Sequence, residues 1–183
     1  ALRYCDDEDR YWIRDYIAGE SLGDDAVITD SSLVYMIEQL KALHQVPVGL
    51  SLPKVNISDK AEAYWSIIEA RGTDAEMLKM KALMQVAMSE PPAGDFCLCH
   101  FDPVPANWLY TAEGLQLLDW EYAGFGHPLW DLAALLQGIV HDMRAHSLRI
   151  QHNDHSQEAL SAAIEQRIIE LYGIENPLAW RRA

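Results

Sequence analysis

Polar residues between positions 97 and 131 have the types and spacing that phosphoryl transfer requires. Asp102 lies two positions after His100 and five before Asn107, which matches the spacing of a kinase catalytic loop. Asp119 follows at the end of an apolar run. Because Mg²⁺ holds nucleotide phosphates and accepts carboxylate and amide oxygens, we expect Asn107 and Asp119 to be metal ligands. Asp102 is then the expected catalytic residue, which orients a hydroxyl and takes its proton.

Three apolar runs of strand length must position these polar residues. Residues 96–99 lead into the polar loop, and residues 108–110 and 115–118 follow it, with a turn at 111–114 between them. Short apolar runs bounded by turn residues are typical of β-strands. We therefore predict that three strands bring the polar residues together at one end of a small sheet.

The segments HFDPVPAN (100–107) and LDWEYA (118–123) together resemble the paired signature of the choline kinase, thiamine kinase and aminoglycoside phosphotransferase superfamily. The following segment, GFGHPLWDLA (124–133), is similar to the third segment of that superfamily. The resemblance is nearest to the choline and thiamine kinase branch. It implies ATP as co-substrate, Mg²⁺ as cofactor, and a structural role for Asp131 and His100, with Asp131 bracing the catalytic loop from behind.

The same resemblance implies an α+β fold: a protein-kinase-like C-terminal lobe, mostly helical with a small β-hairpin catalytic sheet, plus a remnant N-terminal hairpin. Residues 1–20 would form the end of the N-lobe and the hinge, and residues 21–183 the helical C-terminal lobe with the catalytic loop at 97–123. Main-chain groups of Asp15 and Ile17 would contact adenine. Because no glycine-rich phosphate loop precedes Ala1, we expect a fragment or truncation with weak activity or none.

Helical periodicity accounts for most of the remaining chain. We expect helices over residues 32–44, 59–70, from 73 or 74 to near 90, from 128 towards 146, and 157–172. Asp30 or Ser31 is the expected cap of the first helix. The polar stretch 144–155 is interpreted as a helix end and loop.

The net charge of the chain limits its partners. A formal charge of −14 and a pI near 4.7 disfavour nucleic acid and anionic membrane surfaces, whereas a cationic small molecule fits. The 183 residues suit one domain, and the absence of a signal peptide or an apolar membrane span predicts a cytoplasmic protein. Three cysteines indicate reduced thiols. Cys97 and Cys99 suggest zinc beside His100, but no partner pair stands at ligand spacing, so we interpret them as buried strand residues.

Residues near Asp119 are candidates for acceptor binding. A carboxylate with aromatic rings suits a quaternary ammonium or thiazolium ion, so we expect Glu121, Tyr122 and Trp130 to bind the substrate. The predicted function is phosphorylation of a hydroxyl on a small cationic metabolite such as choline or thiamine. Two alternatives stay open: an inactive kinase-like binding module, and a metal-dependent phosphohydrolase using His100, Asp102 and Asp119. The sequence determines neither the acceptor nor the oligomeric state.

Overall fold

The computed structural model describes residues 2–5, 12–23, 28–47, 54–88, 94–150 and 154–175. Runs of short strands and runs of helices follow one another within these ranges, which is consistent with the predicted α+β class. In chain order they are β1 (Leu2–Cys5), β2 (Trp12–Arg14), β3 (Glu20–Ser21), α1 (Asp30–His44), α2 (Ile57–Arg71), α3 (Ala75–Met88), β4 (Cys97–Cys99), β5 (Trp108–Thr111), β6 (Gly114–Leu117), β7 (Gly124–Gly126), α4 (Leu129–Ile150) and α5 (Asp154–Tyr172). Short 3₁₀ turns occupy Pro105–Asn107 and Trp120–Tyr122.

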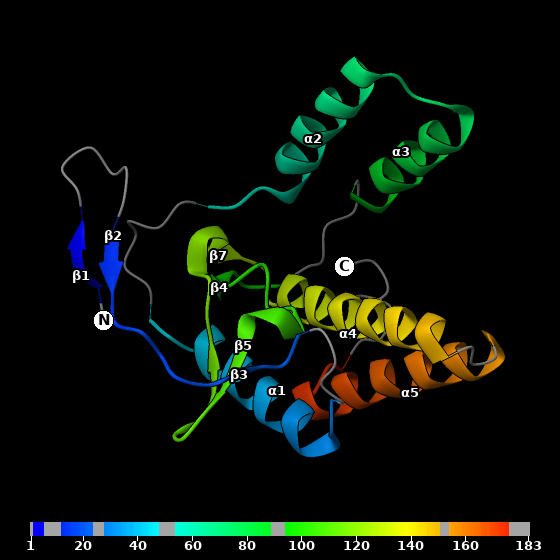
Figure 1. The fold of residues 1–183 in the computed structure, drawn as a ribbon. Helices are drawn as coiled ribbons and strands as arrows, with labels where there is room; N and C mark the ends of the chain where they lie inside the picture. Colours follow the sequence, from blue (N-terminus) through cyan, green and yellow to red (C-terminus); the bar gives the residue numbers. More distant parts are fainter. Residues whose placement is uncertain are drawn as a thin grey trace.

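Three helices enclose the main core. Figure 1 shows α1, α4 and α5 packed together, and α5 contacts both of the others. The core is formed by buried apolar side chains: Leu22, Leu33, Met36, Ile37, Leu40, Trp108, Leu115, Leu129, Leu132, Leu135, Ile139 and Ile168. The apolar stripes that helical spacing predicts for residues 32–44 and for the helix after Pro128 therefore face this core.

The strands form separate small sheets, so the prediction of a single sheet is wrong. Strand β4 pairs antiparallel with β7, with Cys97 opposite Gly126. The β5–β6 hairpin instead pairs through β5 with β3. Apolar runs mark where strands lie, but the choice of partner depends on contacts between distant segments. The predicted N-terminal hairpin is confirmed, because β1 pairs antiparallel with β2.

Several helix boundaries differ from their predictions. Thr29 caps α1: its side-chain oxygen accepts from the Ser32 N–H at 3.1 Å, and the Ser32 hydroxyl accepts from the Thr29 N–H at 3.1 Å. This reciprocal pair satisfies two backbone donors, so a cap at Asp30 or Ser31 is wrong. The stretch 144–155 is predicted to be a helix end and loop, but α4 continues to Ile150 and α5 begins at Asp154, so the helical part is longer than predicted. The sequence over 144–150 is rich in polar residues and has no regular apolar spacing, so periodicity did not predict this extension.

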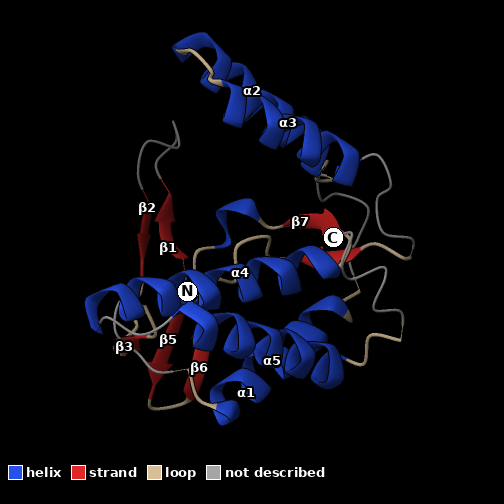
Figure 2. Ribbon diagram, turned by 90° about the vertical axis from the view of Figure 1, so that its right-hand side faces the viewer, coloured by secondary structure: helices blue, strands red, loops and turns tan. Residues whose placement is uncertain are grey.

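Helices α2 and α3 form a hairpin that stands apart from the other helices in both ribbon views (Figures 1 and 2). No residue of α2 is buried. The indole N–H of Trp65 donates to the Met84 sulfur at 2.9 Å, which links the two helices to each other. Across the described ranges, no helix combines the length and apolarity that crossing a bilayer requires.

Candidate active site

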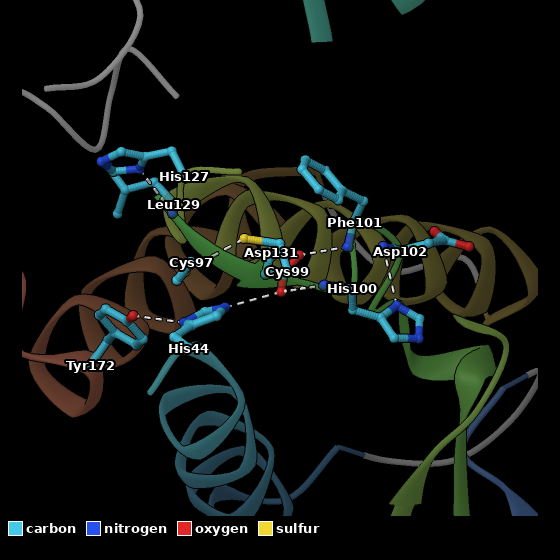
Figure 3. A network of polar contacts seen from close by, with 10 residues as sticks. All are labelled: His44, Cys97, Cys99, His100, Phe101, Asp102, His127, Leu129, Asp131 and Tyr172. Atoms are coloured by element: carbon cyan, nitrogen blue, oxygen red, sulfur yellow. Dashed lines mark hydrogen bonds and ion pairs between the residues drawn. The ribbon is translucent and has the colours of Figure 1, made fainter. Parts of the chain in front are cut away.

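The carboxylate of Asp131 holds the first residues of the predicted catalytic loop (Figure 3). The Asp131 side chain is fully buried on the first turn of α4. Its Oδ2 accepts from the backbone N–H of His100 at 2.9 Å, and its Oδ1 accepts from the backbone N–H of Phe101 at 2.6 Å. Hydrogen bonds from two successive N–H groups fix the direction in which the chain leaves β4. These are the contacts that a brace behind the loop would make.

A second layer of contacts supports the Asp131 carboxylate. His44, the last residue of α1, places Nε2 at 3.0 Å from Oδ2 of Asp131 and Nδ1 at 2.7 Å from the Tyr172 hydroxyl. A carboxylate only accepts, so in the neutral ring Nε2 carries the proton and Nδ1 accepts from the tyrosine. Burial raises the pKa of Tyr172, which keeps its hydroxyl protonated as a donor. The network therefore joins α1, α4 and α5 behind the loop.

His100 is buried and uses both ring nitrogens inside the loop. Its Nε2 donates to the carbonyl of Leu118 at 2.9 Å, and its Nδ1 accepts from the backbone N–H of Asp102 at 3.3 Å. Its ring meets the Trp120 ring edge-on, with centroids 4.7 Å apart. Burial lowers the pKa of His100, so the neutral ring is favoured. These contacts suit a structural member of the loop.

Asp102 and Asn107 form a pair across the loop. The Asn107 amide nitrogen donates to Oδ2 of Asp102 at 3.0 Å and to the Asp102 carbonyl at 2.7 Å. The backbone of Asn107 closes a 3₁₀ turn by donating to the Val104 carbonyl at 2.9 Å. Because its nitrogen makes both side-chain bonds, the amide oxygen of Asn107 is the atom left to bind a metal.

The β5–β6 hairpin brings the two predicted metal ligands to the same end. Leu118 donates its backbone N–H to the Asn107 carbonyl at 2.8 Å, so Asp119 follows directly after the residue that faces Asn107. Asp119 is exposed and adopts a left-handed conformation with φ 63°. An amide oxygen and a carboxylate at an exposed position are a hard-oxygen donor set, which fits Mg²⁺.

Phe101 and Asp119 share an unusual backbone conformation. Within the described ranges they are the non-glycine residues with positive φ, at 68° and 63°. Such conformations cost energy and persist where surrounding contacts impose them. At Phe101 these contacts are the hydrogen bond to Asp131 and the close approach of its ring to Gly126, where a Cβ would collide with the ring.

A cavity of about 600 Å³ lies beside the loop. Asp102 and Asp142 contribute carboxylates to it. The complete lining is Phe101, Asp102, Val104, Pro105, Ala106, Ala134, Gln137, Gly138, Val140, His141 and Asp142. At Gly138 the helix α4 approaches the loop so closely that a Cβ would lie 2.9 Å from Cβ of Val104. Sequence reasoning missed this wall of α4, because its residues look like an ordinary exposed helix face.

The predicted substrate residues lie outside this cavity. Glu121 and Tyr122 are exposed in the second 3₁₀ turn, and Trp130 is half-buried on the first turn of α4. The side chain of Glu121 accepts a hydrogen bond from Tyr122, which raises the pKa of the tyrosine. The Nζ of Lys60 stands 4.9 Å from the Tyr122 ring centroid, so a cation of the protein itself already contacts that ring.

Asp15 and Ile17 lie in an extended segment between β2 and β3. Asp15 is half-buried and Ile17 is exposed. The segment is tied to the catalytic hairpin, because β3 pairs with β5 and the Leu22 N–H donates to the Trp108 carbonyl at 3.0 Å. The structure thus places the predicted adenine contacts just before a strand that joins the loop's own sheet.

A braced H-x-D loop, an Asp–Asn pair and an aspartate at a hairpin end, set in a mostly helical lobe, are the features of a kinase-like phosphotransferase. Comparison with protein families agrees: the model of the APH phosphotransferase enzyme family matches residues 1–167. The chain therefore belongs to the phosphotransferase enzyme family.

Curated relatives point to the same branch as the sequence motifs. Over 88 residues the chain is 32% identical to protein LicA of Haemophilus influenzae, covering 45% of this chain and 25% of LicA. Over 94 residues it is 34% identical to the thiamine kinase of Salmonella newport, covering 51% of this chain and 32% of that enzyme. The chain thus spans between a quarter and a third of the length of these relatives.

Solved structures show the same fold. A choline/ethanolamine kinase family protein from Mesorhizobium loti superposes with a TM-score of 0.54 at 18% identity, covering 98% of this chain and 68% of that one. An aminoglycoside-3'-phosphotransferase of type VIII superposes with a TM-score of 0.52 at 15% identity, covering 88% of this chain and 68% of that one. The kinase-like fold is therefore confirmed.

Proposed function

We propose that this chain carries the catalytic loop of a small-molecule kinase, which transfers the γ-phosphoryl group of ATP to a hydroxyl of a small cationic metabolite such as choline or thiamine. The observation that supports this most directly is the Asp102–Asn107 pair, with 3.0 Å between the Asn107 nitrogen and Oδ2 of Asp102. It places a candidate base and a candidate metal ligand side by side on a loop held by buried hydrogen bonds.

In this mechanism Asp102 accepts a hydrogen bond from the acceptor hydroxyl and takes its proton as the phosphoryl group is transferred. The hydrogen bonds from Asn107 hold the Asp102 carboxylate in one orientation. Asn107 and Asp119 would hold Mg²⁺, which neutralises charge on the nucleotide phosphates when bound. His100 and Asp131 position the loop and touch no reacting atom.

Residues 1–20 are proposed to be the end of an N-lobe and the hinge, and residues 21–183 the C-terminal lobe. Main-chain groups of Asp15 and Ile17 would contact adenine. Two observations support this proposal. β1 and β2 form an antiparallel pair, and β3, which follows them in the chain, pairs with β5 of the catalytic hairpin.

The cavity beside Asp102 supports a small cationic acceptor. Its volume of about 600 Å³ lies within the usual range for ligand pockets. The carboxylates of Asp102 and Asp142 contribute negative charge, and the net charge of −14 adds a favourable long-range field for cations. Glu121, Tyr122 and Trp130 remain proposed contacts for parts of the substrate that extend outside the cavity.

The contacts of His100 argue against a metal-dependent phosphohydrolase. That alternative needs a ring nitrogen of His100 as a metal ligand, but both nitrogens are hydrogen-bonded and the side chain is fully buried. Coordination would leave the Leu118 carbonyl or the Asp102 N–H without its partner. A structural histidine is consistent with the kinase mechanism instead.

The test is Asp102→Asn in the longest natural form of the protein. Asparagine keeps an oxygen for the Asn107 hydrogen bond but is not a base, so we expect ATP-dependent phosphorylation of choline, thiamine or an aminoglycoside to fall by about 10²–10⁴-fold. Glu113→Gln, at the exposed β5–β6 turn, removes one charge and should leave the rate unchanged. Equal rates in the two variants would refute the role of Asp102. If the unaltered protein binds the acceptor without phosphorylating it, the result would favour a binding module.

A further inference from the structure

Two cysteine thiols and a histidine ring gather close to the Asp131 brace. The sulfur atoms of Cys97 and Cys99, on one face of β4, are 3.7 Å apart. One ring nitrogen of His44 completes a group in which all three potential ligand atoms lie within 4.8 Å of one another. Figure 3 shows that these side chains come from β4 and α1. The group therefore arises only when distant segments pack together.

The sulfur separation matches that of a zinc site. Two thiolates at about 2.3 Å from a tetrahedral Zn²⁺ stand about 3.8 Å apart. Ordinary packing explains why strand cysteines are buried, but it does not require an imidazole within ligand reach of both. Thiolate and imidazole are soft or borderline ligands, which favour Zn²⁺ over the Mg²⁺ of the transfer reaction.

The hydrogen bonds of His44 leave one nitrogen suited to coordination. Its Nε2–H donates to Asp131, so the ring's lone pair is on Nδ1, where it accepts from the Tyr172 hydroxyl. Coordination through Nδ1 would exchange only the tyrosine contact. The Asp131 carboxylate would keep its hydrogen bond to Nε2, and a carboxylate is a usual second partner of a zinc-bound histidine.

We propose that Cys97, Cys99 and His44 form a binding site for one thiophilic divalent ion such as Zn²⁺, separate from the proposed magnesium ligands. A fourth position would be filled by water. Cys97 is half-buried and Cys99 is fully buried, so the ion enters from the Cys97 side. Binding releases the two thiol protons to solvent and involves no oxidation or reduction.

The site is tested with Co²⁺ as a spectroscopic probe for Zn²⁺, using the reduced full chain. We expect one equivalent of Co²⁺ to produce a thiolate-to-cobalt charge-transfer band, which one equivalent of Zn²⁺ abolishes. Cys97→Ser and Cys99→Ser should each weaken binding by at least about 100-fold. Cys5→Ser, which alters the remaining cysteine, should retain the band and its stoichiometry. A missing band, or a band that persists in the Cys97→Ser/Cys99→Ser double variant, would overturn the proposal.

A variant at Tyr172 tests the assignment of Nδ1. Tyr172→Phe removes the hydroxyl that competes for this nitrogen, so Co²⁺ should bind equally well or up to about tenfold more tightly. If the folded variant loses binding, His44 is not a ligand through Nδ1.

Alkylation of the unaltered chain gives a measurement that needs no substitution. One equivalent of Zn²⁺ should slow modification of Cys97 by iodoacetamide at least about tenfold, because coordination removes the free thiolate. Unchanged alkylation at saturating Zn²⁺ would contradict the site. Prior oxidation of the pair to a disulfide by peroxide, with two waters formed, should abolish Co²⁺ binding until a reductant is added.

Discussion

The Nε2 atom of His44 lies 3.0 Å from Oδ2 of Asp131, and the same oxygen accepts from the backbone N–H of His100 at 2.9 Å. One buried oxygen therefore connects the end of α1 to the start of the catalytic loop. Because one of these donors is the last residue of α1 and the carboxylate lies on α4, the position of the loop depends on how the two helices pack. Substitutions that shift α1 or α4 should therefore alter the position of the catalytic loop through Asp131.

The Asp131 carboxylate should be a major contributor to stability. In Asp131→Asn one oxygen becomes an NH₂ group that faces a backbone donor, so we expect the free energy of unfolding to fall by about 3 kcal/mol in urea titrations. Asp30→Asn is the matched control, because Asp30 forms an exposed ion pair with Arg167 and should change stability little. Similar losses in both variants would contradict a special role for the buried carboxylate.

Burial of His100 should make stability depend on pH. Its folded-state pKa is lowered by burial, so the unfolded chain binds a proton more readily than the folded chain below the unfolded pKa of about 6.5. The contribution of neutral His100 to the free energy of unfolding is then fully present above about pH 6.5, and it falls as pH decreases towards the folded-state pKa. Urea titrations between about pH 7 and 5 should show this decline in the unaltered chain and a smaller decline in His100→Gln. The control is His141→Gln, at an exposed position, which should show the full decline. A decline of the same size in His100→Gln would exclude this histidine as its cause.

Gly138 should resist enlargement, although glycine is unfavourable within a helix. Replacing it with alanine would ordinarily gain about 1 kcal/mol of helix stability. Here the new Cβ would lie 2.7 Å from Cδ of Pro105, so we expect a loss of about 1–3 kcal/mol instead, measured as a lower Tm. Gln137→Ala, at the exposed neighbouring position, should be nearly neutral. A higher Tm for Gly138→Ala would show that Val104 and Pro105 can move to make room for the added methyl group.

The α2–α3 hairpin should open more readily than the helices around the core. No residue of α2 is buried, whereas α1 buries Leu33, Ile37 and Leu40. Amide hydrogen exchange should therefore be faster throughout residues 57–88 than in the centre of α1, since local opening exposes little apolar surface. Equal protection in the two regions would indicate that the hairpin is held as firmly as the core.

The parts of the structure that depend on local patterns were predictable. Turn residues and apolar runs locate the β5–β6 hairpin, and helical spacing identifies the buried faces of α1 and α4. The three-part motif resemblance identified the family. Its loop residues lie together in the structure: Asp102 and Asn107 are hydrogen-bonded, and Asp131 holds the backbone at His100.

The features that sequence reasoning missed depend on partners distant in the chain. Strand β4 pairs with β7, and not with the hairpin that follows it, because each strand's partner is decided by packing. In the sequence, His44 indicates only that a helix ends there. Its contact with Asp131 and its approach to Cys97 and Cys99 have no local signal. The sequence suggests zinc only beside His100, with no partner pair at ligand spacing, and it does not indicate His44.

Leu118 links the hairpin to the loop through its own main-chain N–H and carbonyl. The Leu118 carbonyl accepts from the ring of His100, and its N–H donates to the Asn107 carbonyl. Any residue other than proline at position 118 would keep this N–H and this carbonyl, so an alanine substitution there would leave the connection undetected. Replacing the 117–118 amide with an ester, by chemical synthesis or semisynthesis, would remove this N–H while keeping the side chain.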